Sequence, residues 1–253
     1  MDYDAIVIGA RCAGAPTAML LARRGYKVLL VDRSTFPSEI PHGHFIHRHG
    51  PRRLHRWGLL GRISATDCPP VSTVTTDFGD FPLTGTDLIV DGVALGYAPR
   101  RSILDKVLVD AAVEAGAELR EGFVVDELIG DGDRIAGIRG RTTSGGALIA
   151  ERATVTVGAD GRNSRLARAV QAPLSEQTVP VTCWYFAYWS GVPQNGLEIY
   201  IRERTVIVVE CCVLHIEAQV RADGLLRVPR GDEGHDGNNS LDSHESPPNF
   251  SAQ

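Results

Sequence analysis

Residues 3–32 read YDAIVIGARCAGAPTAMLLARRGYKVLLVD, and this stretch decides the fold. The apolar run at 5–8 has the composition of a buried strand, and it enters a loop that begins at Gly9 and ends at Gly14. Small apolar residues then recur at helical spacing, and a second apolar run follows at 28–31. This order predicts a strand, helix and strand of a parallel sheet that binds a nucleotide.

The loop and the end of the second strand carry the chemistry of a nucleotide site. Gly9 permits a tight turn off the strand, and Gly14 permits the helix to pack close to the sheet. The N-terminus of that helix offers unpaired N–H groups and a positive dipole end to a pyrophosphate. Asp32, which lies 23 positions after Gly9 (32 − 9), is suitably placed to accept hydrogen bonds from an adenosine ribose.

The loop departs from the usual G-x-G-x-x-G pattern, because Arg11 replaces the middle glycine. Two explanations are open: the backbone there has a conformation that other residues adopt, or the side chain points past the phosphates and adds charge. Cys12, beside it, is better explained as a small side chain in a tight turn than as a redox group.

The composition is that of an ordinary globular enzyme. The chain has 253 residues, 43% of them hydrophobic and 23% charged, and a net charge of −5 disfavours a nucleic-acid partner. The first strand follows Met1 almost at once, and no apolar run approaches the ~18 residues of a membrane span. The five cysteines contain no C-x-x-C pair, so we expect a reducing, cytoplasmic location.

The other elements are predicted from periodicity and from Gly, Pro and Asp punctuation. They are helices at 51–60, 101–115 and 163–170, strands at 71–78, 87–95, 183–189, 197–201 and 205–209, a meander at 122–150, and a strand at 153–157. The last of these ends in Gly158-Ala159-Asp160-Gly161. A second strand and turn with an acidic residue is hard to reconcile with a simple NAD-dependent dehydrogenase.

Four histidines, His42, His44, His47 and His49, fall within eight positions. Their spacing fits no common zinc pattern, and cysteine or acidic partners are not nearby in sequence, so we expect no metal site. His44 is our first candidate for a contact with a cofactor or substrate, and histidines of a surface loop are an equally good explanation.

Four segments together resemble the FAD-dependent oxidoreductases of the p-hydroxybenzoate-hydroxylase type, most closely the geranylgeranyl-reductase-like branch. They are Gly9 to Gly14 with Asp32, Phe36 to Leu60, Ala98 to Asp105, and Gly158 to Ser164. The resemblance implies an α/β fold: a Rossmann-like FAD-binding domain with a central parallel sheet and a β-meander, plus a partial antiparallel β-rich substrate domain. The implied domains are 1–70 with 97–172 for FAD, and 71–96 with 173–220 for substrate.

The resemblance also implies roles for individual residues. The pyrophosphate of FAD would lie against the loop, the adenosine against the second strand, and the flavin side near the later motifs. The residues concerned are Gly9, Ala10, Arg11, Ala13, Gly14, Asp32, Arg33, Arg101, Val125, Asp160 and Gly161. Two of these have simpler explanations: Arg101 as a solvated residue at a helix start, and Asp160 as a turn residue.

The expected function is that of a flavoprotein oxidoreductase. NAD(P)H would reduce the flavin, and a small or lipophilic organic substrate would be hydroxylated or reduced at a double bond. Aromatic residues at 184–189 are candidates for the substrate wall, although such strands are more often core.

Family members are longer and carry a third Gly-Asp motif near the C-terminus. Gly231-Asp232 is a poor match for it, because residues 233–239 will not form a helix. In residues 229–253 only Leu241, Phe250 and Ala252 are apolar, so we expect a disordered tail over residues 221–253. The alternative function is therefore a truncated, catalytically incompetent fragment that binds a dinucleotide, and an NAD-dependent dehydrogenase is a weaker one.

Overall fold

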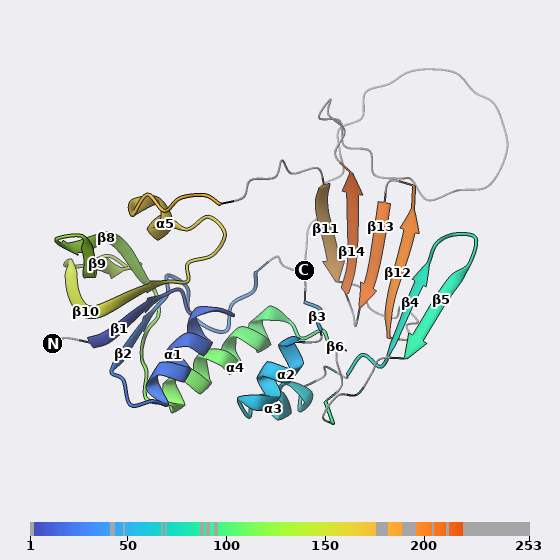
Figure 1. Ribbon diagram of the computed structural model, residues 1–253, viewed down its shortest axis with the longest axis horizontal. Coiled ribbons are helices and arrows are strands. Elements are labelled where there is room, and N and C mark those ends of the chain that lie inside the picture. The colour runs from blue at the N-terminus through green and yellow to red at the C-terminus, as the bar shows by residue number, and fades with distance from the viewer. Residues whose placement is uncertain are drawn as a thin grey trace, which may run out of the picture.

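The computed structural model describes residues 3–40, 44–47, 49–66, 68, 70–86, 89, 92–93, 96–175, 182–188, 196–203, 205–210 and 213–219. These residues form two six-stranded sheets and one two-stranded sheet. In Figure 1 the first large sheet and its helices lie on the left, and the second stands apart on the right. Both large sheets are rich in β-branched residues, as strands require.

The first sheet contains the strands that the opening stretch predicts. Its order is β7 (Glu118–Arg120), β2 (Val28–Val31), β1 (Tyr3–Ile8), β10 (Ile149–Gly158), β9 (Arg134–Thr142) and β8 (Phe123–Asp131). The first four strands are parallel, and β8 and β9 run antiparallel. Strand β10 serves both parts: residues 149–152 pair with β9, and residues 153–158 lie in register with β1.

Two helices pack side by side on one face of the parallel strands. They are α1 (Gly14–Ala22) and α4 (Arg101–Glu114) (Figure 1). Their buried side chains, with Val7 and Leu30 from the sheet, form one core cluster, which α2 (His49–Arg56) and α3 (Leu60–Ser64) extend. The other face of the sheet packs on the meander, so the strands carry apolar residues on both faces.

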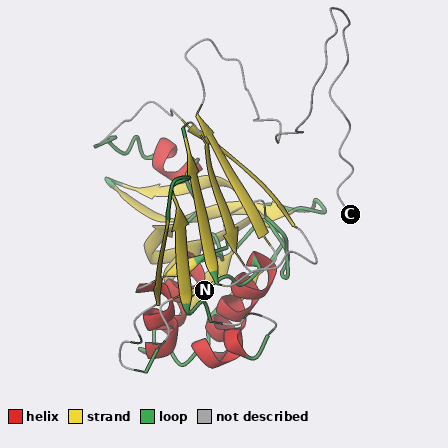
Figure 2. Cartoon of the chain, turned by 90° about the vertical axis from the view of Figure 1, so that its right-hand side faces the viewer, coloured by secondary structure: helices red, strands yellow, loops and turns green. Residues whose placement is uncertain are grey.

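The second sheet joins segments that are far apart in the sequence. Its order is β11 (Thr182–Tyr188), β14 (Val213–Gln219), β13 (Thr205–Glu210), β12 (Leu197–Arg202), β4 (Thr73–Asp77) and β5 (Pro82–Thr86). Figure 2 shows its strands side by side in a layer above the helices. The β4–β5 hairpin enters this sheet through a parallel pairing of β4 with β12.

The two-stranded sheet and one short helix are the remaining elements. Strands β3 (Ile46–His47) and β6 (Gly96–Tyr97) pair with each other, and α5 (Arg165–Ala169) follows β10. The prediction of one helix at 51–60 is wrong: Gly58, with φ +77°, ends the first helix and separates α2 from α3.

Other boundaries also differ from the expectations. The second strand of the inserted hairpin is β5 at 82–86 rather than 87–95, and of that expected range only residues 89, 92 and 93 are described. Strand β14 was not predicted, and α5 begins at Arg165 rather than 163. Trp189, the Gly231-Asp232 pair and the expected tail at 221–253 lie outside the described residues.

Candidate dinucleotide-binding site

The glycine loop lies where β1 and β10 end, and backbone from both strands meets there. Gly9 has φ +99°, and a Cβ atom on it would lie 2.3 Å from the carbonyl oxygen of Ala159. A Cβ on Gly14 would lie 1.7 Å from the carbonyl oxygen of Gly9. The N–H of Ala159 donates to the carbonyl of Ile8 at 2.8 Å. Both glycines are therefore required by close backbone approach, and the two strand ends form one site.

The loop leaves hydrogen-bond donors free where a phosphate would lie. Helix α1 begins at Gly14, and the backbone N–H groups of Ala13 and Gly14 have no acceptor among the described residues. Unpaired donors at a helix N-terminus are suited to an anion. The crowded glycines and these donors together fit the pyrophosphate of a dinucleotide such as FAD.

The side chain of Asp32 accepts hydrogen bonds that hold the glycine loop in place. Its side chain is only 8% exposed, and its Oδ2 accepts a hydrogen bond from the N–H of Ala10 at 2.7 Å. Its Oδ1 accepts from the N–H of Ser34 at 2.8 Å. Each carboxylate oxygen can accept a further bond, so these contacts leave capacity for a ribose hydroxyl. That contact with a ribose stays a prediction.

Arg11 reaches away from the loop and ties it to two other segments. Its backbone is ordinary, since Gln171 is the only non-glycine residue with positive φ in the described ranges. The guanidinium donates through Nη1 to Asp105 at 2.8 Å and through Nη2 to Ser38 at 2.9 Å, and it lies over the ring of Phe36 at 5.2 Å. Arginine is thus accommodated in place of glycine because its side chain has partners outside the loop.

Arg101 is not the solvated helix-start residue that one explanation offered. It is 8% exposed, and its Nη2 lies 2.9 and 3.0 Å from the two carboxylate oxygens of Asp105. The thiol of Cys12 donates to the same carboxylate at 3.4 Å. The protein packed around the thiol raises the pKa of Cys12 to about 11, and Asp105 adds to the rise although Arg101 opposes it. Cys12 is consequently protonated near neutral pH, which does not favour a redox role.

Asp160 holds the turn after β10 together. Its Oδ2 accepts from the N–H groups of Arg165 at 2.7 Å and Leu166 at 3.3 Å, and its Oδ1 accepts from the hydroxyl of Ser164 at 2.6 Å. Burial raises its pKa, but these hydrogen bonds outweigh that effect, and the pKa is lowered overall. The simpler explanation as a turn residue therefore has support in the contacts, and a further contact with cofactor stays a prediction.

The remaining predicted residues surround the same strand ends. Arg33 is exposed next to Asp32, and Gly161 has φ +88° in the turn after Asp160. Val125 lies in β8, which enters the site region because the N–H of Phe123 donates to the carbonyl of Asp32 at 2.8 Å.

His44 lies at the boundary between the two large sheets. It is 1% exposed, so for this residue the surface-loop explanation is wrong. Its Nε2 lies 2.6 Å from the hydroxyl of Tyr188 on β11, and the guanidinium of Arg100 lies over the Tyr188 ring at 4.5 Å. Burial raises the pKa of Tyr188, Glu39 adds to the rise and Arg100 opposes it.

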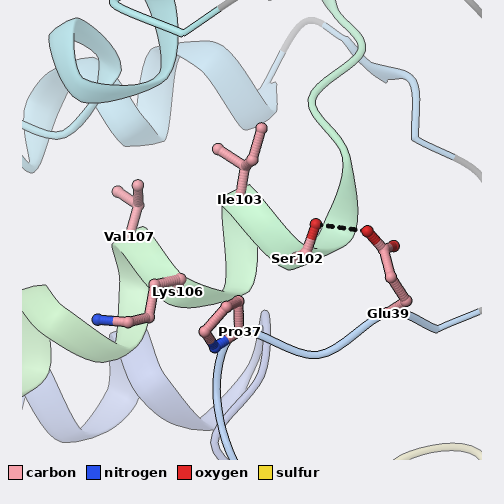
Figure 3. A pocket seen from close by; sticks show the side chains of 6 residues that line it. All are labelled: Pro37, Glu39, Ser102, Ile103, Lys106 and Val107. Carbon is pink, nitrogen blue, oxygen red and sulfur yellow. Dashed lines mark hydrogen bonds between the residues drawn. The ribbon is translucent and has the colours of Figure 1, made fainter.

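An open groove of about 530 Å³ runs along the outer side of α4. Pro37 and Glu39 face it from the loop after β2, and Ser102, Ile103, Lys106 and Val107 face it from the helix (Figure 3). The hydroxyl of Ser102 donates to Glu39 at 2.7 Å, which joins the loop to the helix at the groove (Figure 3).

Metal-ligand clusters and membrane-spanning helices are both absent from the described part of the chain. It contains no cluster of three or more His, Cys, Asp or Glu side chains that could hold a metal ion, and His42 lies outside it. None of its helices is long and apolar enough to cross a membrane.

Sequence reasoning missed several residues that surround the site. Asp105 lies four positions after Arg101, which is the spacing of an ion pair within a helix, so that signal was present. Ser34 and Ser38 carry no such signal. The pairing of Tyr188 with His44 joins residues 144 positions apart, which no local pattern reveals.

Comparison with known proteins identifies the class. The FAD binding domain family matches residues 2–204, and the chain belongs to this family. This match confirms the resemblance, the fold class and FAD as the cofactor of the family.

Two curated relatives and one solved structure are similar to this chain, in agreement with the family match. The digeranylgeranylglycerophospholipid reductase of Methanothrix thermoacetophila is 25% identical over 79% of this chain and 50% of its own length. The probable electron transfer flavoprotein-quinone oxidoreductase YdiS of Escherichia coli is 30% identical over 66% of this chain and 38% of its own. A flavoprotein/dehydrogenase from Cytophaga hutchinsonii superposes with a TM-score of 0.74 at 19% identity, over 86% of this chain and 56% of that one. The chain thus spans 38% to 50% of these curated relatives.

Proposed function

We propose that the chain forms the FAD-binding part of an oxidoreductase whose flavin is reduced by NAD(P)H. The observation that carries this proposal is the close meeting of the Gly9 to Gly14 loop with Ala159 at the ends of two parallel strands. A crowded, glycine-dependent loop with free N–H donors is suited to binding a pyrophosphate, which supports the proposal. Names of relatives such as reductase and quinone oxidoreductase support redox chemistry.

The cofactor would be held along the ends of β1, β2 and β10. The backbone of Gly9, Ala10, Arg11, Ala13 and Gly14 would bind the pyrophosphate. Asp32 and Arg33 would bind the adenosine, and Val125 would contact the adenine. Arg101, Asp160 and Gly161 would contact the diphosphate or the ribityl chain. When bound, the flavin supplies hydride and electron transfer, and the protein supplies orientation and electrostatics.

The substrate would lie toward the second sheet. Tyr188 places a hydroxyl at the boundary, and this hydroxyl shares a hydrogen bond with Nε2 of His44, which donates or accepts according to the tautomer of the imidazole. Because one relative is a digeranylgeranylglycerophospholipid reductase, we propose a small or lipophilic organic substrate. Hydroxylation and double-bond reduction are the two reactions to test, and we propose a cytoplasmic location.

The first experiment measures FAD affinity of the full chain by fluorescence titration. Asp32→Ala removes the acceptor for two backbone N–H groups and for the proposed ribose contact. We expect FAD to bind about 5- to 150-fold more weakly, the equivalent of about 1 to 3 kcal/mol.

The matched control is Asp4→Ala. Asp4 also accepts a backbone hydrogen bond, from Lys27 at 2.7 Å, but at the opposite end of the same strands. FAD affinity should be unchanged in this variant. Equal FAD affinity in Asp32→Ala and the wild type contradicts the assignment of Asp32.

A second measurement separates the alternatives. Adding NADH or NADPH to the FAD-loaded chain under anaerobic conditions should bleach the flavin absorbance. Bound FAD that neither nicotinamide bleaches supports the catalytically incompetent fragment. NAD binding without FAD binding supports the NAD-dependent dehydrogenase.

A further inference from the structure

A buried carboxylate connects the glycine loop to helix α4. Asp105 is 0% exposed, and it accepts hydrogen bonds from two guanidinium groups. Arg101 approaches it through Nε and Nη2, and Arg11 approaches through Nη1. A buried ion needs such partners, because removing a carboxylate from water without them is costly. Two positive charges on one negative charge leave this cluster with a net positive charge.

The ion pair with Asp105 leaves one guanidinium nitrogen of Arg101, Nη1, free to donate to a ligand. Its side chain is 9% exposed and therefore nine-tenths buried. Nε and Nη2 are used by Asp105, but Nη1 has no acceptor among the residues described. A guanidinium has five donors in a rigid plane, so fixing two nitrogens fixes the direction of the third.

In Arg11, unlike Arg101, both terminal guanidinium nitrogens have acceptors among the described residues. Its Nη1 is used by Asp105, and its Nη2 is shared between Ser34 at 3.2 Å and Ser38 at 2.9 Å. Because Arg11 belongs to the glycine loop and Asp105 to α4, this chain of contacts sets the distance between the loop and Arg101. The Arg11 side chain therefore holds Asp105 next to the loop, and the Arg101 side chain retains an N–H donor, at Nη1, that can bind a ligand.

We propose that Asp105 is a positioning residue for the cofactor. It orients Arg101 so that Nη1 donates to the diphosphate of FAD, and Arg11 holds Asp105 beside the loop. This inference rests on the proposed function, since it deepens the description of the same site. It assigns a role to the arginine that replaces the middle glycine of the motif.

The test is a double-mutant cycle read out as FAD affinity of the full apo chain. Asp105→Asn removes the negative charge that orients the two guanidinium groups, and Arg101→Lys keeps the positive charge but removes the planar fork. Each single variant should bind FAD at least about tenfold more weakly, the loss expected for one charge-assisted hydrogen bond. The double variant should be no weaker than the weaker single variant, because both act through one contact.

The matched control is Asp110→Asn, on the same helix. Asp110 also makes an i,i+4 ion pair, with Lys106, but that pair is exposed. FAD affinity should not change. Circular dichroism melting without FAD separates folding from binding, and if Asp105→Asn does not fold, the Arg101→Lys variant alone decides the Arg101 contact.

The outcomes are distinguishable. Wild-type binding with unchanged affinity in Asp105→Asn or in Arg101→Lys overturns the inference and leaves the proposed function intact. Losses that multiply in the double variant also overturn it, because the residues then act independently. A folded wild type that binds no FAD overturns the proposed function itself.

Discussion

The two large sheets of this chain bury their side chains to different extents. Strand β2 of the first sheet is buried at every position, and β1 at every position except one. Strand β5 of the second sheet is exposed at every position, and β4 is half-buried throughout. In the first sheet, helices cover one face of the parallel strands and the meander covers the other, whereas antiparallel strands joined by a hairpin, such as β4 and β5, bring no covering layer with them.

This difference indicates which sheet contributes more to the stability of the fold. The first sheet lies between the helices on one face and the meander on the other, and it carries the crowded loop at its strand ends. The described part of the second sheet exposes Tyr185, Tyr188 and Leu83, and the turn between β4 and β5 exposes Phe81. Substitutions in the first sheet should therefore affect folding and the proposed FAD binding, whereas substitutions at exposed positions of the second sheet should affect stability much less.

The largest expected effect is on the free energy of unfolding, when a buried and an exposed leucine are each replaced by alanine. Leu29 in β2 is 0% exposed, and Leu83 in β5 is 58% exposed. Leu29→Ala should lower the free energy of unfolding by about 3 to 5 kcal/mol, because it opens a cavity between two packed layers. Leu83→Ala should change it by less than about 0.5 kcal/mol. Urea unfolding measures both, and similar losses in the two variants would contradict the comparison.

The next effect compares two glycines. A Cβ on Gly14 would overlap the carbonyl oxygen of Gly9, whereas a Cβ on Gly85 in β5 meets nothing within 4 Å. Gly14→Ala should lower the free energy of unfolding by about 1 to 3 kcal/mol, and it should abolish FAD binding because the loop must move. Gly85→Ala should keep both properties within about 0.5 kcal/mol of the wild type. Normal FAD affinity in Gly14→Ala would show that the loop is not the site.

The smallest effect compares two carboxylates and depends on pH. Hydrogen bonds from Ser164 and backbone N–H groups outweigh burial and lower the pKa of Asp160. Its contribution to stability is therefore full above the unfolded pKa of about 3.9 and is lost as pH falls through the lower folded pKa. Asp160→Asn should destabilise the chain by about 1 kcal/mol at pH 6 and by progressively less below about pH 4.

Asp77 in β4 is the counterpart in the second sheet. A hydrogen bond from the N–H of Gly79, at 2.6 Å, lowers its pKa, and Arg202 adds to this. The ion pair with Arg202 is exposed, so salt screens it. Asp77→Asn should destabilise less than Asp160→Asn, and added salt should shrink the difference from wild type. Equal, salt-independent losses would contradict this.

Local patterns predicted the first sheet well. The two continuous apolar runs, the two glycines and the acidic strand end each follow from short-range physics, so β1, α1 and β2 were found close to their observed bounds. Strand β14 and the hairpin at 82–86 were missed or shifted because their pairing depends on residues far away in the sequence.

The site was predicted only in part, for a similar reason. Gly9, Gly14 and Asp32 lie within one motif, and the structure brings them together. The contact of Arg11 with Asp105 joins residues 94 positions apart. The burial of His44 depends on Tyr188 from the other sheet. No periodicity in either segment carries that information.

The proposed function depends on binding of FAD by the crowded loop of the first sheet. The most direct test is the visible absorption spectrum of the full chain, and of Gly14→Ala, after incubation with FAD and desalting. We expect retained flavin bands in the wild type and a colourless Gly14→Ala protein. A wild type that is folded by circular dichroism and yet colourless would contradict the proposed function.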